Sequence, residues 1–185
     1  MYSAERGSHG LEIQIDSGAL TLDGSKIVGS LIEFSQQDDV EFVSTAQKIG
    51  GTSIVMQKGN DSVEIDNGVV RKSSFSTGGG SDAVLLSSAV KISGNAIFDL
   101  GRGADSVTAD AEIRRATFDL GKGADQITFA GKVKKAFVDL GFDKGSDVVT
   151  VASEDLISRK IVLTNFDKKD ELIIDGESYD YGYLQ

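Results

Sequence analysis

Six aspartates recur every 20 to 23 residues along the chain, and three of them follow two glycines. The clearest copy reads Gly101-Arg102-Gly103-Ala104-Asp105, with glycine four and two residues before the aspartate. Glycine at such positions indicates a tight turn with positive φ or a contact too close for a Cβ atom. The six turn aspartates are Asp61, Asp82, Asp105, Asp125, Asp147 and Asp170.

Stacked turns of this kind would place carboxylates and outward-turned backbone carbonyls around one gap. Such a hard oxygen site suits Ca²⁺, and without a cation the stacked carboxylates would repel one another. The alternative is a structural turn whose carboxylate accepts backbone N–H bonds and holds no metal. Both interpretations stay open. A further outward column of carboxylates, Asp99, Asp119 and Asp139, would extend the cation site or pair with basic groups.

The residues around each turn alternate in hydrophobicity, which predicts strands. Before one turn Ala116, Phe118 and Leu120 share a face, and after it Ile127 and Phe129 do. Each rung would hold two short strands, with the glycine turn at one end and a second bend at the other. A single rung cannot bury its apolar face, whereas rungs stacked at about 4.8 Å can. The sequence therefore predicts an all-β, parallel β-solenoid of about six rungs over residues 50–175.

The flanking regions have weaker patterns. Residues 1–10 are expected to form an arm. Residues 11–49 alternate like strands but lack the turn aspartate, which predicts an N-terminal β cap with irregular first rungs, or a small docking domain. Residues 176–185 are expected to form a C-terminal tail that seals the last rung or contacts a partner.

The turns resemble the RTX family, the haemolysin-type calcium-binding β-rolls with the repeat G-G-x-G-x-D-x-U-x. The resemblance covers residues 54–175, and the stretch from Ile161 to Ile174 looks like the segment that closes many RTX rolls. The motif occurs once per rung of about 20 residues here, against every nine residues in the family, so only one edge would bind metal. The resemblance implies calcium ligands at Asp82, Asp105, Asp125 and Asp147, with turn glycines Gly78, Gly80, Gly101, Gly103, Gly121 and Gly123.

Basic residues gather at the opposite bend of the expected rungs. They form either a solvated edge that keeps the strands soluble, or an interface with an acidic protein surface or a neighbouring copy. The candidate interface residues are Arg114, Arg115, Lys134, Lys135, Arg159 and Lys160.

Composition excludes several classes of protein and site. The chain has 29 acidic against 19 basic residues, a net charge of -10, which argues against nucleic acid as a partner. It has no cysteine and one histidine, which excludes thiolate and multi-histidine metal centres. No apolar run approaches the roughly 20 residues of a membrane helix, so membrane insertion is not expected. It contains no phosphate-loop or nucleophile-elbow motif, and we expect no enzyme and no catalytic residue.

These observations favour a non-catalytic structural β-solenoid for assembly or surface display. The expected partners are other subunits of a larger assembly, or further copies of the chain, and the expected location is a virion or the cell exterior. A phage virion component, such as a capsid decoration, knob or fibre protein, is one form of this hypothesis. The alternative is a secreted or cell-surface RTX-type calcium-binding module, and a polysaccharide-acting β-helix enzyme is a remote third.

Overall fold

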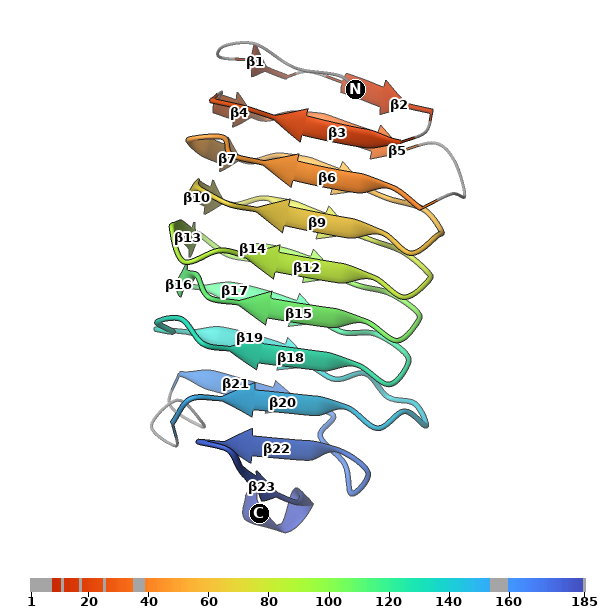
Figure 1. Ribbon diagram of the computed structural model, residues 1–185, viewed down its shortest axis with the longest axis vertical. Coiled ribbons are helices and arrows are strands. Elements are labelled where there is room, and N and C mark those ends of the chain that lie inside the picture. Colours follow the sequence, from red (N-terminus) through yellow and green to blue (C-terminus); the bar gives the residue numbers. More distant parts are fainter. Residues whose placement is uncertain are drawn as a thin grey trace.

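The computed structural model describes residues 8–10, 12–16, 18–24, 26–34, 39–153 and 160–184. They form a parallel β-solenoid of about seven turns with essentially no helix (Figure 1). The predicted fold class is confirmed, with about one turn more than expected. Among the described residues, no helix has the length and apolar character that a membrane span needs.

The strands form three sheets, and consecutive strands from β1 to β18 belong to them in turn, whereas β18 to β22 alternate between two of them. The nine-stranded sheet holds β3 (Ala19–Leu22), β6 (Glu41–Ser44), β9 (Ser62–Ile65), β12 (Ala83–Leu86), β15 (Ser106–Ala109), β18 (Gln126–Phe129), β20 (Val148–Val151), β22 (Glu171–Ile174) and β23 (Glu177–Tyr179). The eight-stranded sheet holds β2 (Glu12–Ile15), β5 (Leu31–Phe34), β8 (Ser53–Val55), β11 (Ser74–Ser76), β14 (Ala96–Asp99), β17 (Ala116–Asp119), β19 (Ala136–Asp139) and β21 (Ile161–Thr164). The six-stranded sheet holds β1 (Ser8–His9), β4 (Lys26–Val28), β7 (Lys48–Gly50), β10 (Gly68–Arg71), β13 (Val90–Ser93) and β16 (Glu112–Ile113).

The six-stranded sheet corrects the expectation of two strands per rung. Its strands are only two to four residues long, too short for alternation to stand out in the sequence. It is built around single buried positions, such as Ile92 and Ile113, which pair in register. The apolar residue at this position in each rung therefore fills the third corner of the core.

Like residues stack on like inside the core. Ala96 pairs with Ala116, and Phe98 with Phe118, in register between β14 and β17. The Phe98 and Phe118 rings are stacked with centroids 5.1 Å apart, and Phe75 lies 4.9 Å from Phe98 on the other side. Because the side-chain period of a strand is two, this buried column fixes the register of the eight-stranded sheet.

Residues 11–49 continue the solenoid. Their described strands, β2 to β7, pair in parallel with the strands that follow, so all three sheets cross the expected boundary at residue 50 without a break. They thus form the first rungs, without the turn aspartate, in place of a separate docking domain. Most of the expected arm, residues 1–7, lies outside the described residues.

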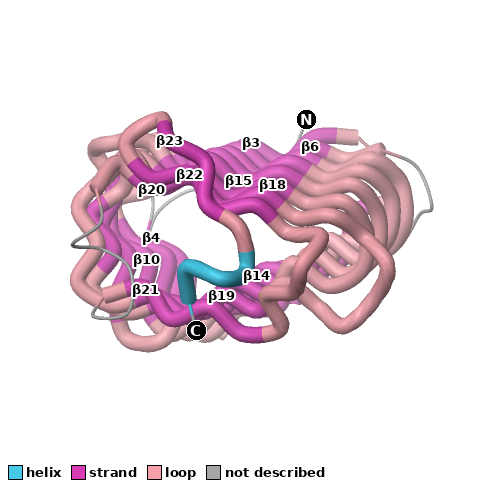
Figure 2. The backbone as a smooth tube through the Cα atoms, turned by 90° about the horizontal axis from the view of Figure 1, so that it is seen from below, coloured by secondary structure: helices cyan, strands magenta, loops and turns pink. Residues whose placement is uncertain are grey.

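The C-terminal tail closes one end of the solenoid. β23 turns back antiparallel to β22, and the 3₁₀ helix η2 (Tyr181–Leu184) lies across the opening in the view along the axis (Figure 2). The Tyr179 and Tyr183 rings lie 4.4 Å apart, and Tyr179 packs against the core. The segment therefore packs against the last rung of the solenoid.

Candidate functional site

The turn aspartates form one column inside the solenoid, at the start of the nine-stranded sheet. All six are buried, with between 0 and 7 % of their surface exposed. Asp105 lies on the inward face together with Val107, two positions later in the same strand direction. The expected arrangement, with carboxylates beside outward-facing carbonyls, is therefore wrong, because the side chains point into the turn.

A hydrogen-bond ladder links these carboxylates from rung to rung. The Asp82 amide donates to Asp105 Oδ1 at 2.7 Å, and the Asp105 amide donates to Asp125 Oδ1 at 2.8 Å. Each carboxylate thus satisfies the amide at the same place in the preceding rung, as the structural interpretation of the turn predicted. The remaining donor–acceptor pairs are Val40 to Asp61, Asp61 to Asp82, Asp125 to Asp147 and Asp147 to Asp170.

The second carboxylate oxygen has no such partner. Oδ2 of Asp61, Asp82, Asp105 and Asp125 is buried and makes no hydrogen bond to any described residue. Removal from water disfavours the charged form, so burial raises the pKa of Asp105 and of Asp125 to about 7 and that of Asp61 to about 6, with neighbouring carboxylates adding to the effect. Burial raises the pKa of Asp147 to about 7 in the same way. These oxygens can therefore take up a proton or a cation.

Close stacking of the backbone explains the glycines. Gly103 has φ of 148°, and a Cβ atom built there would lie 1.4 Å from the carbonyl oxygen of Gly80 in the preceding rung. The same contact recurs one rung later, where a Cβ on Gly123 would lie 1.4 Å from the Gly103 oxygen. Glycine is needed because the turns touch backbone to backbone, so the motif does not by itself require a metal.

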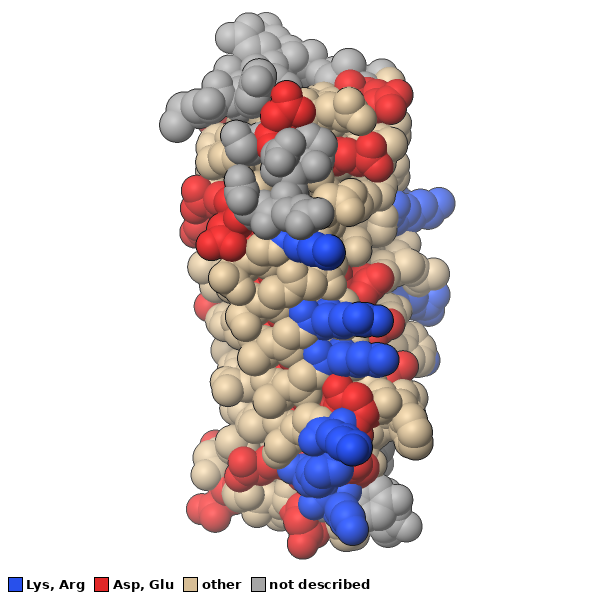
Figure 3. All heavy atoms as spheres, turned by 90° about the vertical axis from the view of Figure 1, so that its right-hand side faces the viewer, with Lys and Arg blue, Asp and Glu red and all other residues tan. Residues whose placement is uncertain are grey.

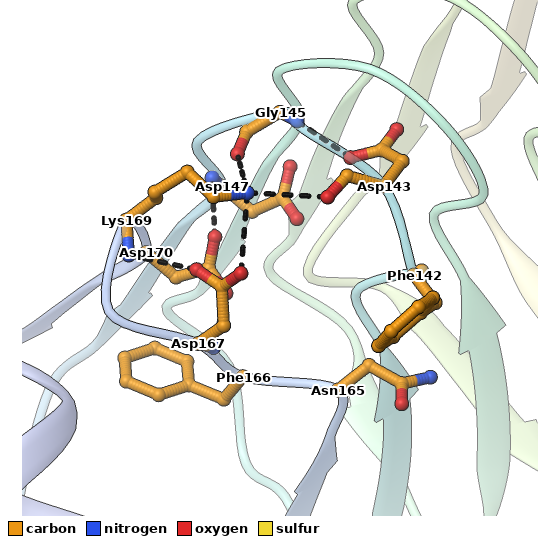
Figure 4. Close-up of a pocket in the computed structure, with 10 residues that line it drawn as sticks. Phe142, Asp143, Gly145, Asp147, Asn165, Phe166, Asp167, Lys169 and Asp170 are labelled. Atoms are coloured by element: carbon orange, nitrogen blue, oxygen red, sulfur yellow. Dashed lines mark hydrogen bonds and ion pairs between the residues drawn. The ribbon is translucent and has the colours of Figure 1, made fainter.

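The turn before Asp147 has two extra residues, and they change its chemistry (Figure 4). Asp143 accepts the Gly123 amide at 2.7 Å and the Gly145 amide at 2.6 Å. Lys169 extends into this turn from the next rung. Its ammonium lies 3.1 Å from the Asp143 carbonyl, 3.4 Å from the Gly145 carbonyl and 3.1 Å from Asp167 Oδ2. The inserted turn before Asp147 therefore holds a cation that belongs to the chain itself.

The predicted metal ligands lie in one column but do not form a calcium coordination shell. Ca²⁺ takes six to eight oxygen ligands, and the described residues contain no group of three or more acidic or histidine side chains that could hold a metal ion. One oxygen of each carboxylate is already used by an amide. The glycine carbonyls at Gly80 and Gly103 point at the next turn's glycine. The calcium site that the RTX resemblance implies would therefore need backbone carbonyls as further ligands, and it stays a prediction.

The outer flank of the turn edge carries charges of both signs, whereas basic residues were expected at the opposite bend. Asp99, Asp119 and Asp139 stack in register on the outward face of the eight-stranded sheet. Arg102 and Lys122 form a second, exposed column just beyond the first turn glycine. Lys and Arg side chains line this edge next to acidic ones (Figure 3). The sequence already contained the pattern that predicts this cation column, because Arg102 and Lys122 both occupy the variable position between the two turn glycines.

The opposite bend is less basic than expected because an acidic residue shares it. Arg114 Nε lies 3.1 Å from Glu112 Oε1, and Lys91 Nζ lies 3.9 Å from Glu112 Oε2. The hydrogen bond from Arg114 lowers the pKa of Glu112. Lys135 lies over the ring of Phe137, 4.9 Å from its centroid. Of the other predicted interface residues, Arg115 and Lys134 are exposed, Lys160 is half-buried, and Arg159 lies outside the described residues.

Comparisons of this chain with protein-family models, with curated proteins and with solved structures give no match. The RTX resemblance therefore rests on the turn motif and stays a prediction.

Proposed function

We propose that this chain is a non-catalytic structural protein whose solenoid serves as a rigid element for assembly or surface display. The observation that carries the proposal is the unbroken register of the rungs. Parallel strands pair rung to rung from β2 to β21 in one sheet and from β3 to β22 in another. Stacked rungs of this kind present a fixed and repetitive outer surface.

The chemistry of the turn edge supports this proposal over the remote alternative of a polysaccharide-acting enzyme. The buried aspartates are engaged by backbone amides. The pocket beside Asp147 contains the Lys169 ammonium, bonded to carbonyl oxygens of the inserted turn (Figure 4). These groups hold neighbouring rungs together and are not presented to a substrate.

The finer form of the proposal is a virion component, such as a capsid decoration, knob or fibre protein of a tailed phage. A rod that is sealed at its C-terminal end by β23 and η2 suits attachment along its sides or by its other end. The acidic surface, with a net charge of -10, suits a basic or cation-bearing partner surface.

Sedimentation of the native protein tests this function. Material from the source would be fractionated on a density gradient and probed with an antibody raised against the purified chain. The proposal predicts that the protein migrates with particles and leaves them only under dissociating conditions. Recovery only as a free small protein inside cells would contradict it, and recovery from the medium or cell envelope without particles would favour the secreted alternative.

A second candidate, the secreted or cell-surface calcium-binding module, is favoured by the four buried Oδ2 atoms that lack a hydrogen-bond partner. A cation would relieve the cost of burying them. Calcium titration calorimetry on the wild type and on Asp105→Asn/Asp125→Asn tests it. A saturable heat that the double variant loses would support the module, and no heat above dilution would reject it.

A further inference from the structure

A shallow groove runs along the outer flank of the turn edge. One wall is the carboxylate column at Asp99 and Asp119, and the other is the cation column at Arg102 and Lys122. Turn glycines form the floor between the columns, and Phe142 lies at the C-terminal end of the groove with 93 % of its surface exposed. Both columns repeat from rung to rung at about 4.8 Å.

The charges on the two walls are not paired with one another. The ion pairs found among the described residues involve Lys91, Arg114 and Lys169, and none includes Arg102 or Lys122. The carboxylates also repel along their own column. Burial together with the charges of Asp99 and Asp139 raises the pKa of Asp119. The groove therefore holds two ladders of opposite sign, side by side, with no ion pair between them among the described residues.

This pattern limits the kind of partner that fits. A polyanion would be attracted by the cation column but repelled by the carboxylates beside it. A polycation would be attracted by the carboxylates but repelled by the cations. The best complement presents a column of each sign, both at the rung spacing. A second copy of this chain has that property by construction.

We propose that this groove binds a second copy of the chain, side by side, with the two solenoid axes parallel and pointing the same way. The inference rests on the proposed role in assembly and names the partner and the face. A two-fold axis parallel to the solenoid axis exchanges the columns, so Arg102 and Lys122 of one copy face Asp99 and Asp119 of the other at equal height. The exposed Phe142 ring at the end of the groove is covered in the same contact.

The opposite orientation is disfavoured by the same geometry. A two-fold axis lying in the contact plane and perpendicular to the solenoid axis would place like column against like. The parallel pair also brings both N-terminal ends to one side, which suits two rods standing on one surface. Because the contact is isologous, it closes at two copies and does not propagate.

The test is the molar mass of the full chain in solution, measured by light scattering over a dilution series at about 0.15 M and about 1 M salt. The wild type is expected to reach twice its chain mass of 19.6 kDa at the lower salt and to dissociate more readily at the higher. R102E/K122E alone and D99K/D119K alone are expected to stay monomeric, because each presents one sign on both walls. Mixed in equal amounts, they are expected to form a mixed dimer.

The control is K132E/K134E, which makes the same charge change on exposed residues of the opposite bend and is expected to dimerise like the wild type. Circular dichroism would first show that each variant is folded. A monomeric wild type, a dimeric R102E/K122E, or loss of the dimer only in K132E/K134E would each overturn the inference. If the protein is monomeric but still sediments with particles, the dimer contact is rejected and the proposed function is retained.

Discussion

At the second turn glycine of four rungs, namely Gly80, Gly103, Gly123 and Gly145, there is no room for a methyl group. The carbonyl oxygen of Gly80 occupies the place where the Cβ atom of residue 103 would lie, and φ at Gly103 is positive. The aspartate two residues later is equally constrained, because its Oδ1 accepts an amide that lies inside the wall of the rung. The preceding rung therefore determines which residue fits at each of these turn positions, and this explains why the motif recurs at the rung period.

Gly103→Ala should lower the free energy of unfolding by about 3 kcal/mol or more, because it combines a backbone clash with strain at positive φ. The matched control is Gly176→Ala, where φ is 82° and nothing lies within 4 Å of the added Cβ. There only backbone strain applies, at about 1 kcal/mol. Urea denaturation would measure both losses, and two equally small values would count against the stacking explanation.

The buried aspartates predict that the protein is more stable in acid than in base across the neutral range. The folded-state pKa of Asp105 and Asp125 is about 7, above the ordinary value of 3.8. The folded state thus binds more protons than the unfolded state between these values, and stability falls as pH rises through 7. The expected loss between pH 5.5 and pH 8 is about 2 kcal/mol per aspartate. Asp105→Asn/Asp125→Asn should flatten the dependence, and an unchanged slope in urea melts would contradict the assignment.

At the scale of the strand, the sequence predicted the strands in which apolar and polar residues alternate. The alternation of Ala116 and Phe118 with polar neighbours identified the eight-stranded sheet, and Ile127 and Phe129 identified the nine-stranded one. The six-stranded sheet was missed because strands such as β16 have only two residues. Lys169 was missed because its contacts lie 24 and 26 residues away and leave no local pattern. Alternation of apolar and polar residues reveals the local conformation of a strand. A contact between side chains of different rungs leaves no such pattern in the sequence.

The aromatic stack should contribute strongly to the stability of the sheet. Phe98→Ala removes a fully buried ring between two stacked neighbours, and we expect a loss of about 3 to 5 kcal/mol. Phe137→Ala removes the same side chain from the outward face of β19, two strands away in the same sheet, where it is 38 % exposed. The loss there should be about 1 kcal/mol or less. Comparable losses in thermal denaturation would show that the inward face is wrongly assigned.

Lys169 should hold the last two rungs together. Lys169→Ala leaves the Asp143 and Gly145 carbonyls without their ammonium partner, which should cost about 1 kcal/mol at this partly exposed site. Hydrogen exchange should therefore quicken in β20 and β22 and stay unchanged in β6 and β9. Lys168→Ala, an exposed neighbour, is the control. If hydrogen exchange accelerates equally along the whole solenoid, Lys169 does not stabilise the last two rungs specifically.

At the scale of the whole molecule, the solenoid is a stack in which each rung contacts mainly its neighbours. Its stability is therefore a sum of rung and interface contributions. All three sheets begin before residue 50. The six-stranded sheet ends at β16, and the other two continue to the C-terminal end, where β23 and η2 lie (Figures 1 and 2). The turn column runs through this stack with amides, and at its end Lys169, as partners. We therefore infer that the rod supports itself along its turn edge, as a structural element needs to.

Thermal unfolding with calcium and with excess chelator tests this claim most directly. Calcium at about 5 mM lies above the range of 10⁻⁴ to 10⁻³ M in which extracellular calcium modules bind. A ligand present at 100 times its dissociation constant stabilises the folded state by about 2.7 kcal/mol, several degrees for a chain of this length. We predict that the protein is folded in both conditions and that its thermal unfolding midpoint is the same with calcium and with chelator. A midpoint several degrees higher with calcium, or a chain that is unfolded in chelator, would contradict this prediction and establish the calcium-binding alternative.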